Sequence, residues 1–426
     1  MSETSSKNNL RHAQRAYWFG VANGILFLTG LAFVDPATVL PTFVSRLTDS
    51  DIVVGLVSAI GMGGWFMPQL FAAHYLQATP YKRPLYIKAS FLRGAGWLIA
   101  IPLVLLFAAE RPFLALIGFF FGYSMFAFGG GLGGPAFLDI VAKTVPPNQL
   151  GSFFGHRMFW GSLGAIAAGI LVRTVLAEGG VSFPLSYALL FAIALANFAV
   201  GWAIFAAIRE PRGRLAESQS FVAMLKDAPD LIRRHSTYRL LLISRLLFGS
   251  SAIAFPFYIV YCRRALGVEE SSVGTYLTIE MVGTMIAIPL CAYLNDRRGA
   301  RALLLFATLL GLVGPGLAAL ASLLPVTPAL GRILFGGVFL SLTAVGSGTF
   351  MGYTNYLIGI APEERRPVYI GIHNTLYAVT AFLPILGGLI IRLASFRLLF
   401  IVATLFALSG ALMASRLPPT SQVSKD

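Results

Sequence analysis

Glu280 is the residue of this chain best suited to proton chemistry. It lies about nine residues, or ~14 Å, into the apolar run 271–294, between Ile279 and Met281. A carboxyl group in a medium of low dielectric constant tends to hold its proton, so Glu280 could load and release a proton or bind a cation. Alternatively, it is a structural carboxyl that is hydrogen-bonded to a neighbouring helix.

Asp35, Arg245 and Arg93 are three of the other charged residues in the apolar runs. Asp35, which precedes Pro36, could also carry a proton, or it could be a solvated carboxylate at a helix kink. Arg245 could clamp an anion with its planar guanidinium, or it could extend to lipid headgroups. We expect Arg93 to extend to the headgroups.

Amides and phenols recur along the same runs, and these groups can orient a small solute in a cavity. Many such groups simply bridge helices, which is the alternative interpretation. The predicted cavity-lining residues are Asn23, Gln69, Tyr123, Arg157, Arg245, Tyr258, Tyr276, Tyr353, Asn355, Tyr356, Asn374 and Tyr377.

Composition indicates that these runs lie in a lipid bilayer. The chain has 426 residues, of which 57% are apolar and 12% charged. In a soluble domain roughly 45–50% of the residues are apolar and about 25% are charged. The runs are long enough to span a hydrocarbon core of ~30 Å. The twelve predicted spans are residues 16–44, 52–76, 84–107, 112–142, 152–177, 184–208, 239–261, 271–294, 302–324, 330–360, 367–392 and 396–414.

Topology explains the net charge of +14 better than nucleic-acid binding does. If the N-terminus lies in the cytoplasm, about 22 Lys and Arg fall in cytoplasmic segments and about 8 outside, as the positive-inside rule requires. We therefore predict an integral, multi-pass membrane protein with both termini in the cytoplasm and no nucleic-acid partner. The short outer loops are compatible with a bacterial inner membrane.

The two halves of the chain repeat each other. Residues 139–157 align with residues 355–373, and His156-Arg157 aligns in this way with Ile372-His373. Other aligned pairs are Pro146 with Pro362, Phe153 with Tyr369, and Gly155 with Gly371. A membrane protein made of two like halves is usually a transporter with two gates around one central site.

A second repeat carries a family resemblance. Residues 75–83 align with residues 293–301, and the later copy reads Leu-Asn-Asp-Arg-Arg-Gly-Ala-Arg from position 294. That copy resembles the loop motif of the major facilitator superfamily, G-x-L-x-D-R-x-G-R-[RK]. By this resemblance, Asp296, Arg297 and Arg301 would latch a cytoplasmic gate, and Gly299 would supply a tight turn.

The first-half copy of the motif departs from the pattern. Ala78 stands where the motif has Asp, and Tyr81 stands where it has Gly. Only Lys82 and Arg83 retain the basic residues with which the motif ends. We therefore expect the latch in this half to be weaker or to be built from other residues.

The predicted fold class is an all-α membrane protein with twelve transmembrane helices in two pseudo-symmetric six-helix bundles. The connector could form two short helices broken at Pro229, or it could be a flexible tether. The predicted parts are a cytoplasmic tail (1–15), an N-terminal bundle (16–208), a cytoplasmic connector (209–238), a C-terminal bundle (239–414) and a second cytoplasmic tail (415–426).

The resemblance implies a secondary active transporter that moves a small solute across the cell membrane by alternating access, with proton coupling as an option. A polytopic membrane enzyme, such as a lipid-linked transferase, would need a reactive cluster, and none is evident among the five scattered His. A substrate-sensing receptor on a transporter scaffold is the third option. We expect no enzyme activity, no cofactor and no metal, and a monomer whose partners are the solute, the bilayer and protons.

Overall fold

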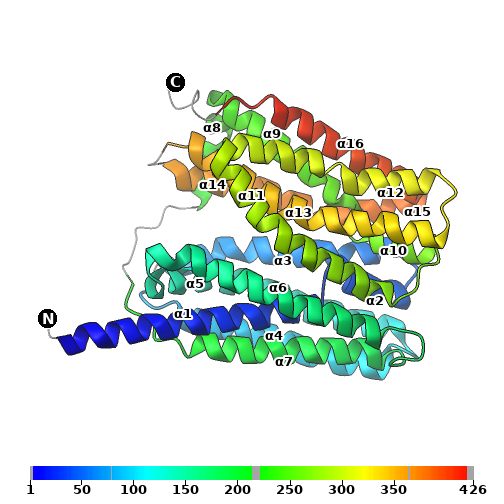
Figure 1. The fold of residues 1–426 in the computed structure, drawn as a ribbon, viewed down its shortest axis with the longest axis horizontal. Helices are drawn as coiled ribbons and strands as arrows, with labels where there is room; N and C mark the ends of the chain where they lie inside the picture. Colours follow the sequence, from blue (N-terminus) through cyan, green and yellow to red (C-terminus); the bar gives the residue numbers. More distant parts are fainter. Residues whose placement is uncertain (1–2, 78, 214–220, 363–364, 420–426) are drawn as a thin grey trace. The chain divides into compact units, whose positions relative to one another are not determined.

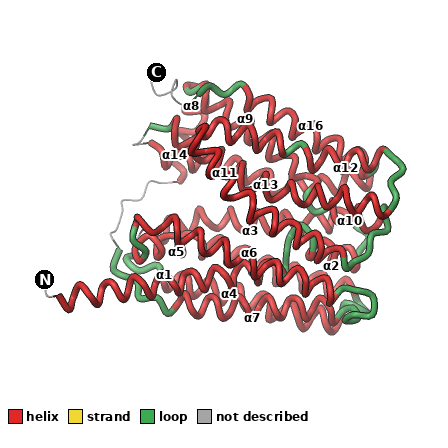
Figure 2. Tube along the Cα trace, in the orientation of Figure 1, coloured by secondary structure: helices red, strands yellow, loops and turns green. Residues whose placement is uncertain are grey.

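The computed structural model describes residues 3–77, 79–213, 221–362 and 365–419. Within them it gives the backbone alone for residues 3–11, 70–77, 221–227 and 367. Every regular element in the described ranges is helical (Figure 2). The prediction of an all-α membrane protein is therefore confirmed.

The number of membrane-spanning helices agrees with the prediction. Ten described stretches are long and apolar enough to cross a membrane, and one of them, Ser272–Leu323, has 52 residues. This stretch contains Gly299, whose φ of 79° and ψ of 168° interrupt the helix. Dividing the stretch there and adding the first helix of the chain gives twelve spans, so the chain is an integral, multi-pass membrane protein.

The first predicted span is interrupted. We predicted one run over residues 16–44, but helix α1 (Glu3–Ala32) ends before Asp35-Pro36, and helix α2 begins at Val39. Proline has no N–H group to donate, and it disfavours the helical conformation of the residue before it. The break at Asp35 is the kink that the sequence allowed.

Contacts between Cα atoms divide the chain into two compact units. Unit 1 comprises residues 1–35 and 60–218, and unit 2 comprises residues 36–59 and 219–426. Helix α3 (Asp51–Gln77) contributes to both. The other elements of unit 1 are α1, α4 (Arg83–Phe107), α5 (Pro112–Thr144), η1 (Pro147–Gln149), α6 (Leu150–Val175) and α7 (Leu185–Ala206).

Unit 2 contains the remaining helices (Figure 1). Within it α11 packs along α13, and α16 packs against α9 and α12. Its elements are α2 (Val39–Leu47), α8 (Phe221–Arg234), α9 (Ser236–Ser250), η2 (Ser251–Ala254), α10 (Phe257–Arg264), α11 (Ser272–Leu310), α12 (Val313–Leu323), α13 (Pro328–Ile360), α14 (Arg366–Ala378), η4 (Val379–Phe382), α15 (Leu383–Leu393) and α16 (Phe396–Ser415).

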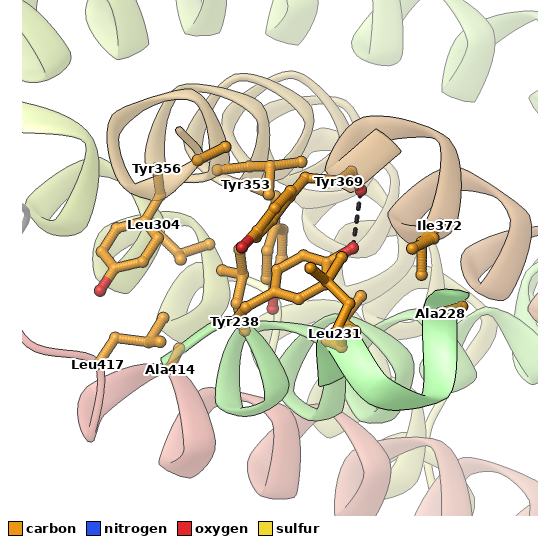
Figure 3. Close-up of a cluster of buried hydrophobic side chains, with 14 residues drawn as sticks. Ala228, Leu231, Tyr238, Leu304, Tyr353, Tyr356, Tyr369, Ile372, Ala414 and Leu417 are labelled. Atoms are coloured by element: carbon orange, nitrogen blue, oxygen red, sulfur yellow. Dashed lines mark hydrogen bonds between the residues drawn. The ribbon is translucent and has the colours of Figure 1, made fainter. Parts of the chain in front are cut away.

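The described part of the connector forms one helix instead of two, because α8 continues through Pro229. Its last turns pack on unit 2, where Ala228 and Leu231 join an apolar cluster at the start of α9. In Figure 3, Tyr238 lies below Tyr353 and Tyr369 and donates a hydrogen bond of 2.7 Å to the carbonyl oxygen of Tyr369. This cluster fixes the ends of α9, α13 and α14 together.

Close packing of α4 on α5 in unit 1 depends on glycine. A Cβ atom on Gly122 would overlap the carbonyl oxygen of Gly96, and a Cβ atom on Gly96 would overlap that of Gly122. Backbone cannot move aside as a flexible side chain can. These glycines therefore hold the two helices at their separation, as small residues do in membrane interfaces.

We expect Gly122→Ala to lower the stability of the purified protein by about 1–3 kcal/mol through overpacking. The measurement is thermal unfolding in detergent, followed by tryptophan fluorescence and size-exclusion chromatography. Gly155→Ala is the matched control, since a Cβ atom on Gly155 would meet nothing within 4 Å. Equal melting temperatures for both variants would contradict the packing argument.

Candidate transport site

Arg245 of α9 is the centre of a buried cluster in unit 2. Its side chain is 8% exposed. Its guanidinium carbon lies 3.8 Å from the ring centroid of Tyr377 and 4.7 Å from that of Tyr353. Tyr353 is itself fixed, because its hydroxyl lies 2.8 Å from Ser244 Oγ, and Ser244 donates to the carbonyl oxygen of Gly410 at 3.0 Å.

His373 of α14 completes this cluster. It is 4% exposed, and its ring centroid lies 6.2 Å from that of Tyr353. Its Nδ1 lies 3.3 Å from Oδ1 of Asn374, to which it can donate. Its Nε2 is buried without a hydrogen-bond partner among the described residues. Asn374 is exposed, so the cluster reaches the surface of the unit there.

Glu280 lies in the first part of α11 and is 4% exposed. Helical spacing puts it on one face with Tyr276 and Gly283. Tyr276 stacks on Phe339 of α13 at 4.8 Å, and Gly283 also packs on α13. Glu280 therefore lies on the face of α11 that packs against α13.

Unit 1 holds a polar network around Arg157 of α6. Arg157 donates to Asn23 Oδ1 at 3.1 Å and to the carbonyl oxygen of Gly20. Asn23 in turn donates to the carbonyl oxygen of Gly201 at 2.9 Å and to the hydroxyl of Tyr86 at 3.4 Å. These bonds join α1, α4, α6 and α7, so this group bridges helices in the way the alternative interpretation described.

Several predicted cavity residues lie in aromatic or helix-bridging positions. Tyr123 stacks on Phe119 in unit 1, and Tyr258 stacks on Phe400 in unit 2. The hydroxyl of Tyr356 donates to the carbonyl oxygen of Pro418 at 2.7 Å, within the apolar cluster of Figure 3.

The remaining positions are more polar. The hydroxyl of Tyr276 lies 3.3 Å from Cys262 Sγ, and Asn355 donates to Asn295 Oδ1 at 3.1 Å. Gln69 is partly buried in α3, and Asp35 is partly buried beside Tyr123. A cavity role for all of these residues stays a prediction.

Arginines of the aligned motif copies make the same contact in both units. Arg83 donates from Nε to the carbonyl oxygen of Ala206 at the end of α7, at 2.6 Å. Arg301 donates from Nε to the carbonyl oxygen of Leu417, just after α16, also at 2.6 Å. Both arginines therefore satisfy carbonyl groups that the end of a helix leaves without partners.

The other residues of the second-half motif make only some of the contacts that a gate latch would need. Gly299 has the positive φ expected for its turn. Asp296 accepts a hydrogen bond from Asn295 at 3.3 Å, and Arg297 lies over the ring of Tyr293 at 5.6 Å. None of the ion pairs between described residues includes Asp296. Its role as a gate latch stays a prediction.

Sequence reasoning missed the carboxylate of the first half, Glu210. Its side chain is 2% exposed and accepts hydrogen bonds of 2.8–2.9 Å from the backbone N–H groups of Lys82 and Arg83 at the start of α4. Lys143 contacts it at 2.9 Å and also pairs with Asp139. Ala78, which stands in place of the motif's Asp, lies outside the described residues.

Two features explain this arrangement. A carboxylate at the N-terminus of α4 satisfies N–H groups that have no partner within the helix, and it interacts favourably with the helix dipole. Burial lowers the pKa of Lys82, although Asp139 and Glu210 partly oppose this effect. The signal that could have found the cluster is the acidic residue Glu210 at the end of a predicted span, among basic neighbours.

A second missed cluster lies at the other end of unit 2. Arg264 of α10 donates to Asp51 Oδ1 at 3.0 Å and to the carbonyl oxygen of Thr48 at 2.9 Å. Glu270 pairs with Arg46 at 2.8 Å and with Arg263 at 3.3 Å. These bonds join the segment around α2 to α10 and to the loop before α11, at the end of the unit opposite α8 and α14 (Figure 1).

The described residues contain no group of three or more His, Cys, Asp or Glu side chains that could hold a metal ion. The polar groups brought together are instead single charges, amides and phenols between helices. Such groups can bind a solute or a proton without an attached cofactor.

Comparison with known proteins agrees with this architecture. A bacterial homologue of the iron transporter ferroportin, in its inward-facing state, is 17% identical with a TM-score of 0.73 and covers 96% of this chain and 98% of its own. The nucleoside transporter NupG is 13% identical, with a TM-score of 0.69 and coverage of 95% and 98%. The E. coli fucose:proton symporter is 15% identical, with a TM-score of 0.59 and the same coverage.

These likenesses establish the fold. A search of curated proteins finds no match to the chain. The sequence model of the Major Facilitator Superfamily matches residues 240–426. The family model thus matches the second half of the chain, and the solved structures share its fold over nearly its whole length.

Proposed function

We propose that this protein is a secondary transporter that moves a small solute across a membrane by alternating access, driven by a proton gradient. The observation that carries the proposal is the burial of Glu280, Arg245 and His373 within otherwise apolar spanning helices. A charge in the hydrocarbon core costs about 2.5–3.5 kcal/mol on insertion scales, so a stable protein retains it where function requires it.

Proton coupling is the finer part of this proposal. Among the structural relatives are a fucose:proton symporter and a D-xylose-proton symporter, which lends support to a proton gradient as the driving force. Glu280 is our first candidate for the proton carrier because it is almost fully buried. Asp35, partly buried at the helix break, is the second.

The polar contacts at the two ends of unit 2 support alternating access. Arg264 and Asp51 hold one end, and Arg301 holds the other through the carbonyl oxygen of Leu417. A transporter needs closures that can form and break on opposite sides of its site. We propose that these contacts belong to the outer and inner gates respectively.

The test of transport is counterflow in proteoliposomes. Liposomes that hold purified protein and excess unlabelled solute should accumulate the labelled solute transiently, because a transporter exchanges one for the other. Candidate solutes come from a thermal-shift screen of sugars, organic anions, amino acids and drugs. Binding without counterflow would favour a receptor, and chemical conversion of the solute would favour a membrane enzyme. Either outcome would overturn the transport proposal.

We expect both termini to lie on the cytoplasmic side of a bacterial inner membrane, with the protein acting as a monomer. Alkaline phosphatase is active only outside the cytoplasm, so its fusions to either terminus should be inactive. A fusion at Ala108, in the loop after α4, should be active, because about 22 Lys and Arg then fall in cytoplasmic segments. Equal signals from all three fusions would contradict this topology.

A further inference from the structure

We propose that Arg245 binds an oxyanion, a carboxylate or phosphate group, of the transported solute. The proposal rests on the transport function above and gives the class of its substrate. It concerns one cluster within unit 2, formed by Arg245, Tyr353, His373, Asn374 and Tyr377.

Arg245 carries a charge that no ion pair between described residues neutralises. The side chain is 92% buried, as only 8% of it is exposed. Its Nε has no hydrogen-bond partner among the described residues, and none of their ion pairs includes Arg245. A buried cation is normally paired with an anion, because its desolvation is otherwise uncompensated. A bound oxyanion would supply the missing charge.

The side chain is held in a fixed position, which argues against simple extension to the headgroups. An arginine that extends to the membrane surface keeps its guanidinium in water. The guanidinium of Arg245 instead lies over the rings of Tyr377 and Tyr353, at 3.8 and 4.7 Å from their centroids. Tyr353 is anchored by Ser244 at 2.8 Å. Such stacking leaves the edge of the guanidinium fork available for two parallel hydrogen bonds to an oxyanion.

His373 adds a second buried polar atom without a partner. Its Nδ1 faces Asn374 Oδ1, so its Nε2 is the ring atom that remains for a ligand. The cluster reaches the surface of the unit at Asn374, which is exposed and lies one turn before Tyr377 on α14. Arg245 can thus bind the oxyanion while His373 bonds to a neighbouring polar group of the same solute.

Arg93 in unit 1 provides a matched comparison. It is also an arginine within a span whose Nε lacks a partner among the described residues, and it lies 4.3 Å from the ring centroid of Phe126. Its other ring contacts are Phe27 and Trp202, and these surroundings lack a counterpart of His373. Arg93→Gln therefore removes a partly buried charge within a span without touching the proposed oxyanion site.

The experiment measures thermal stabilisation of the purified full-length protein by lactate, glucose 6-phosphate and glucose. We expect at least one of the two anions to stabilise the wild type and Arg93→Gln, and glucose to have no effect. Arg245→Gln should lower the affinity for that anion roughly ten- to hundredfold, which is the contribution of a charge-assisted hydrogen bond. Arg245→Lys should keep part of the affinity because the charge remains without the fork. Lactate and glucose 6-phosphate distinguish a carboxylate from a phosphate.

Three results would overturn the inference: no stabilisation by either anion, equal stabilisation of the wild type and Arg245→Gln, or the same loss in Arg93→Gln. Unliganded melting temperatures show whether each variant is folded. Counterflow of the labelled anion separates this inference from the transport function. If an anion binds in a way that requires Arg245 but shows no counterflow, the transport function alone is contradicted. If a neutral solute shows counterflow that Arg245→Gln leaves unchanged, the oxyanion site alone is contradicted.

Discussion

Glu280→Gln should abolish accumulation of solute against a gradient while leaving exchange of labelled for unlabelled solute largely intact. Glutamine has the size and hydrogen-bonding groups of a protonated glutamic acid but cannot release a proton. A carrier fixed in that form can still alternate with its solute. It cannot move a proton with each cycle, so the gradient no longer drives uptake or efflux.

The measurement is solute uptake into proteoliposomes under an imposed pH gradient, with counterflow in its absence. Glu269→Gln is the matched control, because Glu269 is an exposed carboxylate shortly before the same helix. It should accumulate solute as the wild type does. Accumulation by Glu280→Gln with unaltered pH dependence would show that Glu280 is structural. Asp35→Asn would then be the next variant to measure.

The spanning helices were predictable because the bilayer imposes one physical requirement on all of them. Each must present about 20 mostly apolar residues, and this length is visible without knowledge of any contact. Helix α7 (Leu185–Ala206), predicted as residues 184–208, shows how closely such a run gives the helix. The first span failed only where Pro36 prevents continuation, since hydropathy carries no information on backbone hydrogen bonds.

The contacts between helices were less predictable because their partners are far apart in the sequence. The Arg245 cluster combines α9, α13 and α14, and Glu210 meets Lys82 across 128 residues. Residue type identified Arg245 and Glu280 as candidate functional residues, since a buried charge is costly. It could not predict that Arg245 would lie over the rings of Tyr353 and Tyr377, or that Glu280 would lie on the face of α11 that packs against α13.

The motif repeat predicted more in one half than in the other. Gly299 has the positive φ that its place in the motif requires, and Arg301 caps the end of α16. In the first half Ala78 occupies the motif's acidic position. Comparison of the two copies could therefore only indicate that a carboxylate is missing there. The structure supplies a carboxylate from elsewhere in the chain, at the end of α7.

Glu210→Gln should lower the stability of the protein by about 3–5 kcal/mol, the usual effect of removing one partner of a buried ion pair. The carboxylate, 2% exposed, accepts hydrogen bonds from two backbone N–H groups and from Lys143. Glutamine keeps one acceptor oxygen, but its NH2 group would face the N–H groups that now donate to Glu210. Two donors cannot form a hydrogen bond with each other. Asp296→Asn is the matched control in the other half, where the carboxylate accepts only from its neighbour Asn295 in the described structure. We expect its melting temperature to be that of the wild type.

A double-mutant cycle shows whether the ion pair or the cap on α4 carries this stability. Lys143→Met removes the cation and leaves Glu210 bound to the backbone N–H groups of Lys82 and Arg83. If the ion pair dominates, the double variant should be more stable than the sum of the two single effects predicts, because neither charge is then left alone. Additive effects would assign the stability to the cap. Unchanged thermal unfolding in Glu210→Gln would contradict both accounts.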